Sequence, residues 1–321
     1  AGVQRARVVD ADVLVAVGGG SSLDVAKVMA TLTTHDADPE AVGRRAVEEA
    51  SLSPESGDPL PIVAVPTTLA GADLSTVAGV TFALDTEAER PASGGVGDER
   101  LMPAAICYDA DLYRTTPESI LAASAMNGFD KGVEALYTNN STPVTDGTAV
   151  RGLRLLRSGL STLREEPMDA DRLDDVLAGI VCAQYGVSEP GAYKLSIVHA
   201  FGHGFSRNTD AHQGVVHGIV APHVLRYLFE HVDGRRNLLA EALGADAAED
   251  ADVTADAVVD AVAEVRDDLG LPARLRTIDG LDRADLDDVA DRIADDALME
   301  TVPADLDPSV DDVRAVLDSA W

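Results

Sequence analysis

The chain has 321 residues, of which 46% are hydrophobic, so it is long enough to bury a substantial core and to form two domains. Its 56 acidic and 25 basic residues give a formal net charge of −31. A chain so negative repels nucleic acids and anionic membranes, so neither is expected as a partner.

The acidic residues are spread along the chain and are densest in two stretches, 245–268 and 282–296. A surface covered with carboxylates stays folded where salt screens its self-repulsion, which is typical of a halophilic protein. No apolar run is long enough to cross a membrane, and residues 1–9 lack a basic segment followed by an apolar one. We therefore expect a salt-adapted, cytoplasmic protein.

The two cysteines, Cys107 and Cys182, are too few and too isolated for a disulfide framework or a cysteine-rich zinc site. Both have apolar neighbours in the sequence. We expect both to be buried thiols.

Three apolar runs, each followed by a turn, occupy the first third of the chain. Residues 13–17 lead into Gly18-Gly19-Gly20-Ser21-Ser22 and then into a helical pattern, residues 62–65 stop at Pro66-Thr67-Thr68, and residues 104–108 end at Asp109. Strands that alternate with helices form parallel sheets, whose loops at the carboxyl ends of the strands hold the ligand.

From Pro117 onward the strand signal disappears and helical periodicity takes over. Helical patterns cover residues 120–136, 148–163, 173–185 and 197–205, and further helices continue to Trp321. The sequence therefore predicts an α/β dinucleotide-binding domain with a parallel sheet over residues 1–116 and an all-α catalytic domain over residues 117–321.

The glycine-rich turn at residues 18–20 lets a backbone approach a pyrophosphate closely, and the helix that follows directs its amides and its dipole at the anion. Such a turn alone is equally compatible with an ordinary strand-to-helix connection. The chain has only three lysines, Lys27, Lys131 and Lys194, and Lys27 continues this same motif. No motif requires Lys194, for which we expect a structural role.

Several motifs occur in order along the chain: GGGSSLDVAK, PTTLAGADLS, MPAAICYDADLYRTTP, AMNGFDKGVEALYTNNSTP and VHAFGHGFSRNTDAHQGVVHGIVAPH. Together they resemble the iron-containing alcohol dehydrogenase family over nearly the whole chain. The resemblance implies an alcohol dehydrogenase or carbonyl reductase that uses NAD or NADP, acts on a small-molecule alcohol or carbonyl compound, and forms a homo-oligomer. The first motif would bind the pyrophosphate and the second would line the nicotinamide, which implies as cofactor-binding residues Gly19, Gly20, Ser21, Asp24, Thr67, Thr68 and Leu69.

Members of this family carry a longer segment before the glycine turn than the seventeen residues found here. We expect the beginning of the dinucleotide-binding domain to be missing. The sheet would then have an exposed edge, and the adenosine half of the cofactor site would be incomplete.

The family typically binds a divalent metal through an aspartate, a histidine four residues later on the same helix, and two later histidines. The matching helix positions here are Asn127 and Lys131, while the later histidines remain as His199 and either His212 or His217. Asparagine compensates charge poorly and a protonated lysine repels a dication, so iron or zinc is possible but not expected.

Loss of the aspartate resembles the maleylacetate reductase branch of the family, as does the EALY segment at residues 134–137. That branch normally keeps the helix histidine, so Lys131 departs from it. Ser93 is a second departure, because many relatives have a lysine near the cofactor at that position.

We hypothesise that the ammonium of Lys131 replaces the metal ion and polarises the substrate oxygen. His203 is the first candidate for proton donor, and His199 and His212 would orient the substrate. Three alternatives remain: the histidines are ordinary polar groups of helices, the enzyme is metal-dependent with altered ligands, or the chain is a catalytically silent relative that keeps the fold.

Overall fold

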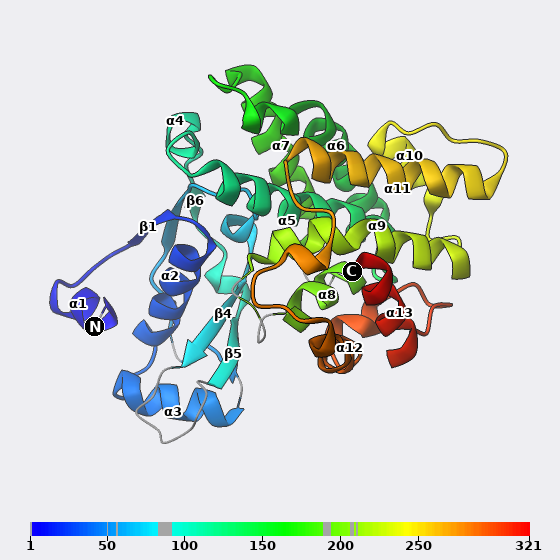
Figure 1. Cartoon of the computed structure of the whole chain (residues 1–321). Coiled ribbons are helices and arrows are strands. Elements are labelled where there is room, and N and C mark those ends of the chain that lie inside the picture. The colour runs from blue at the N-terminus through cyan, green and yellow to red at the C-terminus, as the bar shows by residue number, and fades with distance from the viewer. Residues whose placement is uncertain are drawn as a thin grey trace. The chain divides into compact units, whose positions relative to one another are not determined.

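The computed structural model describes residues 2–49, 51–55, 57–82, 92–188, 194–205, 209 and 211–321. The chain divides into two compact units, Ala1–Thr115 and Thr116–Trp321 (Figure 1). The first unit is α/β and the second is helical, as the sequence predicts.

The first unit contains the expected parallel sheet, with the strand order β1 (Leu14–Gly18), β3 (Ile62–Pro66) and β6 (Ala105–Ile106). Strands β1 and β3 pair from Leu14 with Ile62 to Gly18 with Pro66, so both end at the same edge of the sheet. The third predicted strand is shorter than expected, because only two of its residues join the ladder.

A second sheet was not anticipated. It has the order β2 (Ser51–Leu52), β5 (Ala92–Gly97) and β4 (Val77–Phe82), with β4 and β5 antiparallel. Strand β5 has the sequence ASGGVG, and glycine gives a weak strand signal because it has no side chain to pack. Ser93, where many relatives have a lysine, is in β5. Its side chain is not among those that the structure describes.

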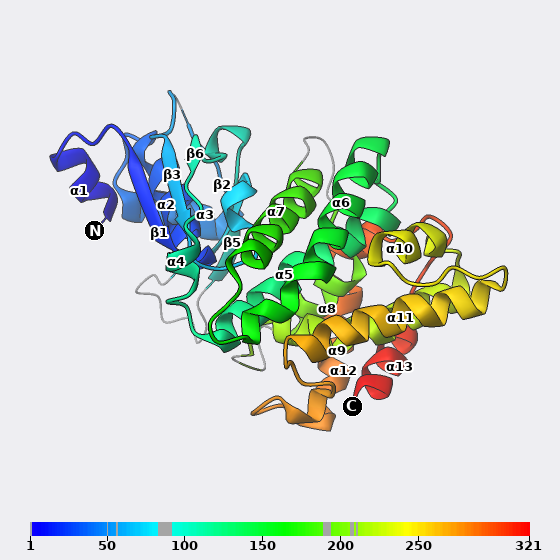
Figure 2. The same cartoon turned by 90° about the horizontal axis from the view of Figure 1, so that it is seen from above.

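Helix α2 (Gly20–Thr33) packs against strands of both sheets, and it provides much of the core of the first unit (Figure 2). Its buried face carries Leu23, Ala26 and Ala30, which meet residues such as Ile62 and Ala64 of β3. The remaining elements of this unit are the helices α1 (Gly2–Val8), α3 (Pro39–Glu49) and α4 (Ala110–Tyr113) and the 3₁₀ segments η1 (Ala72–Leu74) and η2 (Glu99–Leu101).

The second unit is built around α5 (Glu118–Tyr137), in which every residue from Leu121 to Asp130 is buried. Helix α5 packs against several neighbouring helices. The other elements are α6 (Pro143–Gly159), η3 (Leu160–Arg164), α7 (Ala170–Val187), α8 (Ile197–Phe205), α9 (Gln213–His231), α10 (Arg236–Leu243), α11 (Ala251–Asp268), η4 (Leu275–Thr277), η5 (Arg283–Asp285), α12 (Leu286–Ala294), η6 (Ala297–Thr301) and α13 (Val310–Ala320).

The prediction of two buried thiols is wrong. Cys107 is exposed and Cys182 is partly exposed. Cys107 follows β6, an edge strand of two residues, so its apolar sequence neighbours do not place it in the core.

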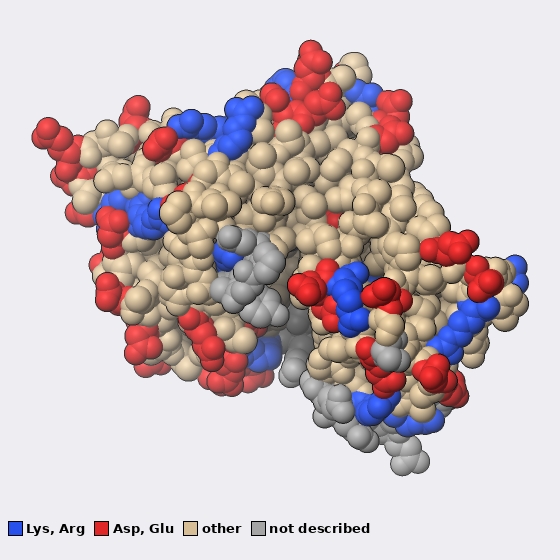
Figure 3. Space-filling model, turned by 180° about the vertical axis from the view of Figure 1, so that it is seen from behind, with Lys and Arg blue, Asp and Glu red and all other residues tan. Residues whose placement is uncertain are grey.

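Acidic side chains are scattered over the face of the molecule seen in Figure 3, with Lys and Arg side chains among them. Several arginines bond carboxylates, as Arg235 does with Asp146 at 2.6 Å. Within the described residues, no helix combines the length and apolarity needed to cross a membrane.

Candidate active site

The glycine turn lies at the carboxyl end of β1. Gly18 has φ +140°, a conformation that side chains disfavour, and Gly19 is the N-cap of α2 without a side-chain capping bond. The first turn of α2 therefore keeps backbone amides that no capping side chain occupies, which is the arrangement that binds phosphate in other proteins.

The second predicted cofactor motif adjoins this turn. Thr67 N donates to Gly18 O over 3.0 Å, and a Cβ added to Gly19 would lie 2.9 Å from Thr68 Cγ2. The side chains of Thr67 and Thr68 are half-buried, whereas Leu69 is fully buried. Leu69 therefore supports the loop from the core.

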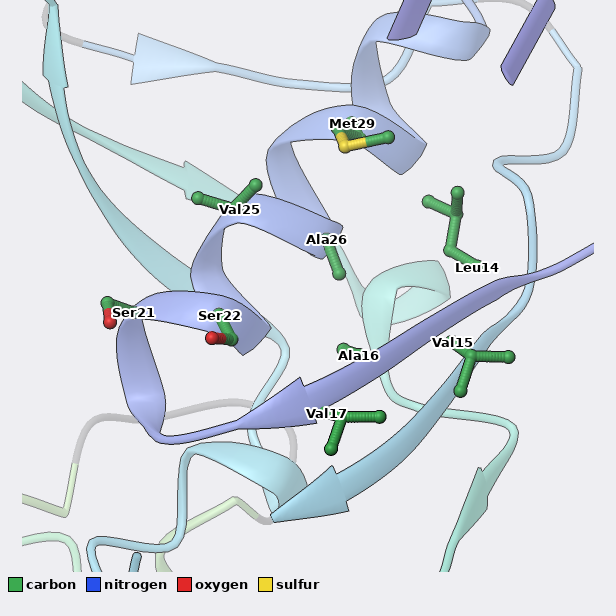
Figure 4. Close-up of a pocket in the computed structure, with 9 residues that line it drawn as sticks. All are labelled: Leu14, Val15, Ala16, Val17, Ser21, Ser22, Val25, Ala26 and Met29. Carbon is green, nitrogen blue, oxygen red and sulfur yellow. The ribbon is translucent and has the colours of Figure 1, made fainter. Parts of the chain in front are cut away.

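A hollow of about 420 Å³ lies between β1 and α2 (Figure 4). Its lining is mostly aliphatic and includes Val15, Val17, Val25 and Met29. Ser21, one of the predicted cofactor-binding residues, also lines it, whereas Gly19 and Gly20 do not.

The second unit contains four polar side chains buried together at the meeting of α5, α8 and α9. Asp130, Glu134 and His217 have no exposed surface, and His199 is 2% exposed. We call these four residues the buried cluster. Of the four, His199 is a predicted catalytic residue, and His217 is the alternative to His212 at the family's metal positions.

Glu134 binds His199 with both carboxylate oxygens. Oε2 lies 2.6 Å from His199 Nδ1, and Oε1 accepts from the His199 backbone amide at 3.0 Å. Burial alone would raise the pKa of Glu134, but His199 and the hydrogen bonds it receives outweigh burial and hold that pKa below its usual value. Glu134 is therefore an anion that also occupies an amide in the first turn of α8.

His217 packs edge-on against His199, with ring centroids 4.3 Å apart. Its Nδ1 lies 3.3 Å from Asp130 Oδ2. Burial raises the pKa of Asp130 well above its usual value, and burial lowers the pKa of His199 to about 4 and that of His217 to about 3. Near neutral pH both imidazoles are therefore uncharged.

A glycine makes room for this packing. A Cβ at Gly202 of α8 would collide with Nε2 of His217. Any other residue at position 202 would displace the second imidazole from the cluster.

The other three predicted catalytic residues lie on the same helices or at their ends, each with a partner of its own. Lys131 Nζ donates to Gln184 Oε1 at 2.6 Å, and His203 Nδ1 lies 2.9 Å from Asp296 Oδ2. His212 Nδ1 accepts from the amide of Gly214 at 3.2 Å and caps α9. His203 and His212 are exposed and Lys131 is half-buried, so all three are more accessible than His199.

The residues at the family's metal positions do not fit a divalent ion. Asn127 Nδ2 donates to Gln213 Oε1 at 3.4 Å, and Lys131 brings a positive charge in place of a ligand. In the part of the chain that the structure describes, no three His, Cys, Asp or Glu side chains are arranged to hold a metal.

Residues 121–321 match the model of the Fe-containing alcohol dehydrogenase family, C-terminal, and residues 1–110 match that of iron-containing alcohol dehydrogenase. The chain belongs to the iron-containing alcohol dehydrogenase family. Members of this family and the relatives that match the chain are alcohol dehydrogenases or reductases, so the chain is an oxidoreductase.

Maleylacetate reductase of Pseudomonas aeruginosa is 29% identical over 98% of this chain and 76% of its own length. Lactaldehyde reductase of Escherichia coli is 26% identical over 97% of this chain and 77% of its own length. The crystal structure of a 1,3-propanediol oxidoreductase has a TM-score of 0.87 and 22% identity, and the match covers 100% of this chain and 80% of that one. This structural likeness shows the fold.

Sequence reasoning missed Asp130 and the role of Glu134, and it offered His217 only as the alternative to His212 at the family's metal positions. A signal for the two carboxylates existed: they stand four residues apart, and so on one face, in a mostly apolar helix. The fully buried Lys27 was noted only as part of the glycine motif.

Proposed function

We propose that the chain interconverts a small alcohol and its carbonyl compound by hydride transfer, with NAD or NADP as cofactor. The contact between the two cofactor motifs, Thr67 N to Gly18 O, supports this most directly. Dinucleotides bind beyond the carboxyl ends of parallel strands, next to a glycine turn that starts a helix. Both features occur here in a family of alcohol dehydrogenases and reductases.

In this proposal the pyrophosphate lies against the beginning of α2, where the absence of side chains on Gly19 and Gly20 lets the anion approach the amides. The full set of cofactor-binding residues is Gly19, Gly20, Ser21, Asp24, Thr67, Thr68 and Leu69. When bound, the nicotinamide supplies or accepts the hydride. The protein's own side chains then manage the charge and the proton of the substrate oxygen.

We propose that these side chains act without a metal. Negative charge develops on the carbonyl oxygen as hydride reaches carbon, and the ammonium of Lys131 stabilises it. His203 donates the proton from an exposed imidazole whose Nδ1 lies 2.9 Å from Asp296 Oδ2. His212 and His199 orient the substrate, with His199 acting from beneath the surface since it is buried.

The substrate class that we favour is a small oxo acid, as the name of the maleylacetate reductase relative indicates for that protein. A substrate carboxylate would pair with a cation such as Lys131. A second cation that would suit this role by its place in the sequence, Arg207, lies outside the described residues.

Calorimetric titration of the purified protein with NADH and NADPH tests the cofactor, and a panel of aldehydes, ketones and oxo acids then tests turnover. We expect binding of at least one nucleotide and reduction of an oxo acid. Binding of neither would favour a catalytically silent relative.

Metal dependence is tested by assaying the same preparation with chelator, iron and zinc. We expect equal activity in all three conditions. Strong activation by iron or zinc that a chelator abolishes would favour a metal-dependent alcohol dehydrogenase with altered ligands.

We also propose that the protein is a homo-oligomer of a salt-adapted cytoplasm. The net charge of −31 repels itself least when salt screens it. The unfolding midpoint should therefore fall when molar salt is replaced by dilute buffer, and light scattering at high salt measures the mass. Equal stability in both buffers contradicts the halophilic assignment.

A further inference from the structure

The buried ammonium of Lys27 has no part in the reaction proposed above. Lys27 lies on the second turn of α2, and none of its surface is exposed. A buried charge is expensive unless polar groups surround it. Here Nζ donates to the carbonyl oxygens of Ala72 and Val77, both at 2.9 Å.

These two carbonyls belong to the loop that carries the second cofactor motif, the first at its middle and the second at its end. Ala72 is the first residue of η1 and Val77 is the first residue of β4. The beginning of the same loop is held by the bond from Thr67 N to Gly18 O. The glycine turn thus holds the loop at one end, and the helix that follows this turn holds it at the other.

The middle of the loop is fixed through Asp73, which is 2% exposed and accepts a hydrogen bond from Tyr108 OH at 2.5 Å. Desolvation lowers the pKa of Lys27 to about 8, against the opposing effect of Asp24 and Asp73. Lys27 is therefore predominantly protonated at neutral pH, and both of its bonds are charge-assisted.

We propose that Lys27 is a positioning residue for the cofactor, holding the loop of residues 67–77 against α2 so that Thr67 and Thr68 adjoin the glycine turn. The inference rests on the proposed nucleotide-binding function. Lys27 does not touch the cofactor in this account and acts through the loop. The tolerance is small, because Thr68 Cγ2 leaves no room for even a Cβ at Gly19.

The test is Lys27→Met, which keeps a long side chain and removes every donor. The dissociation constant of the nucleotide that the wild type binds should rise about tenfold, as expected for loss of charge-assisted bonds. The KM for that nucleotide should rise with it, while kcat at saturating nucleotide stays within about twofold. Hydrogen exchange of the amides at residues 67–77 should accelerate without nucleotide.

Lys194→Met is the matched control, because Lys194 is also buried, at 2% exposure, but lies in the second unit. It should leave nucleotide affinity unchanged. If Lys27→Met does not fold, Lys27→Gln, which keeps a shorter donor, should show a smaller effect of the same kind.

Unchanged nucleotide affinity, or unchanged exchange of the loop amides, in a folded Lys27 variant would overturn the proposal. If the wild type binds neither NADH nor NADPH, the proposed function fails and Lys27 has no cofactor to position. Hydrogen exchange then separates the two failures, since it reports whether Lys27 holds the loop with no nucleotide present.

Discussion

The candidate site of the first unit is formed mainly by backbone atoms, and that of the second unit by side chains. In the first unit the contacts are mainly backbone contacts: Gly18 O with Thr67 N, and two carbonyls with Lys27. In the second unit they join side chains, as Glu134 does with His199 and Lys131 with Gln184.

This difference decides how each site tolerates change. A backbone site survives most substitutions that keep its turns, because every residue supplies the same amide and carbonyl. A site of buried side chains fails when one member is removed, because its partner keeps an unmet hydrogen bond. We therefore expect single substitutions to have larger effects in the second unit.

The largest effect should come from Lys131→Met. If the ammonium stabilises the charge on the substrate oxygen, kcat should fall by about a hundredfold or more, while the dissociation constant of the nucleotide is unchanged. Lys131→Arg, which keeps the charge, should retain more activity than Lys131→Met. Steady-state kinetics on the best substrate of the panel measures both, and a kcat within threefold of the wild type for Lys131→Met would remove this lysine from the mechanism.

Glu134→Gln should cost about 3 kcal/mol in the free energy of unfolding, because it replaces the anion that bonds both the ring and the amide of His199. Tyr137→Phe is the control, since it removes another hydrogen bond to Glu134, of 3.3 Å, and leaves Glu134 itself in place. Denaturant unfolding should show at most about 1 kcal/mol for Tyr137→Phe. Equal losses in the two variants would mean that the bonds between Glu134 and His199 contribute no more to stability than the bond from Tyr137.

The fold of this protein could be predicted from its sequence to a large extent. The apolar runs and the glycine turn gave β1, β3 and α2, and helix α8 has the predicted bounds, because these elements depend on local periodicity. The second sheet could not be predicted, since β5 is rich in glycine and pairs with β2, a strand of only two residues.

The candidate site was likewise predictable where it depends on local motifs, and not where it depends on long-range contacts. The residues assigned to the cofactor lie in two short motifs that are recognisable one at a time. The buried cluster joins Glu134 to His199 and Asp130 to His217 across 65 and 87 positions of the sequence, so no local pattern could show these pairs. Only the packing of α8 on α9, with Gly202 at the contact, brings the two imidazoles together.

A pH titration of stability tests whether the imidazoles of the buried cluster are uncharged. The folded-state pKa of His217, about 3, lies below the ordinary value of 6.5, so the unfolded chain binds more protons as pH falls between these values. Stability is therefore lost on acidification, by up to about 1.4 kcal/mol per pH unit for this residue. His199, with its pKa of about 4, adds to the loss, while Asp130, with its raised pKa, opposes it.

The variant His217→Gln isolates the contribution of His217 to the pH dependence of stability. Between pH 6 and pH 4.5, as an approximate working range, it should lose less stability than the wild type in denaturant unfolding. His231→Gln is the control, because His231 is exposed at the end of α9. Parallel pH profiles for the wild type and His217→Gln would show that His217 is not held neutral.

The smallest effect should be that of Tyr108→Phe in the first unit, which removes the hydrogen bond to Asp73. The loop keeps its backbone bond at Thr67 and both bonds from Lys27, so we expect a loss of only about 1.5 kcal/mol in the free energy of unfolding and a less than threefold change in nucleotide affinity. Burial raises the pKa of the Tyr108 phenol, so the hydroxyl remains a donor above neutral pH and the effect should not change as the pH rises. A larger change in affinity than that of Lys27→Met would reverse the ranking, and would mean that a side-chain bond, rather than the backbone and its lysine, fixes this loop.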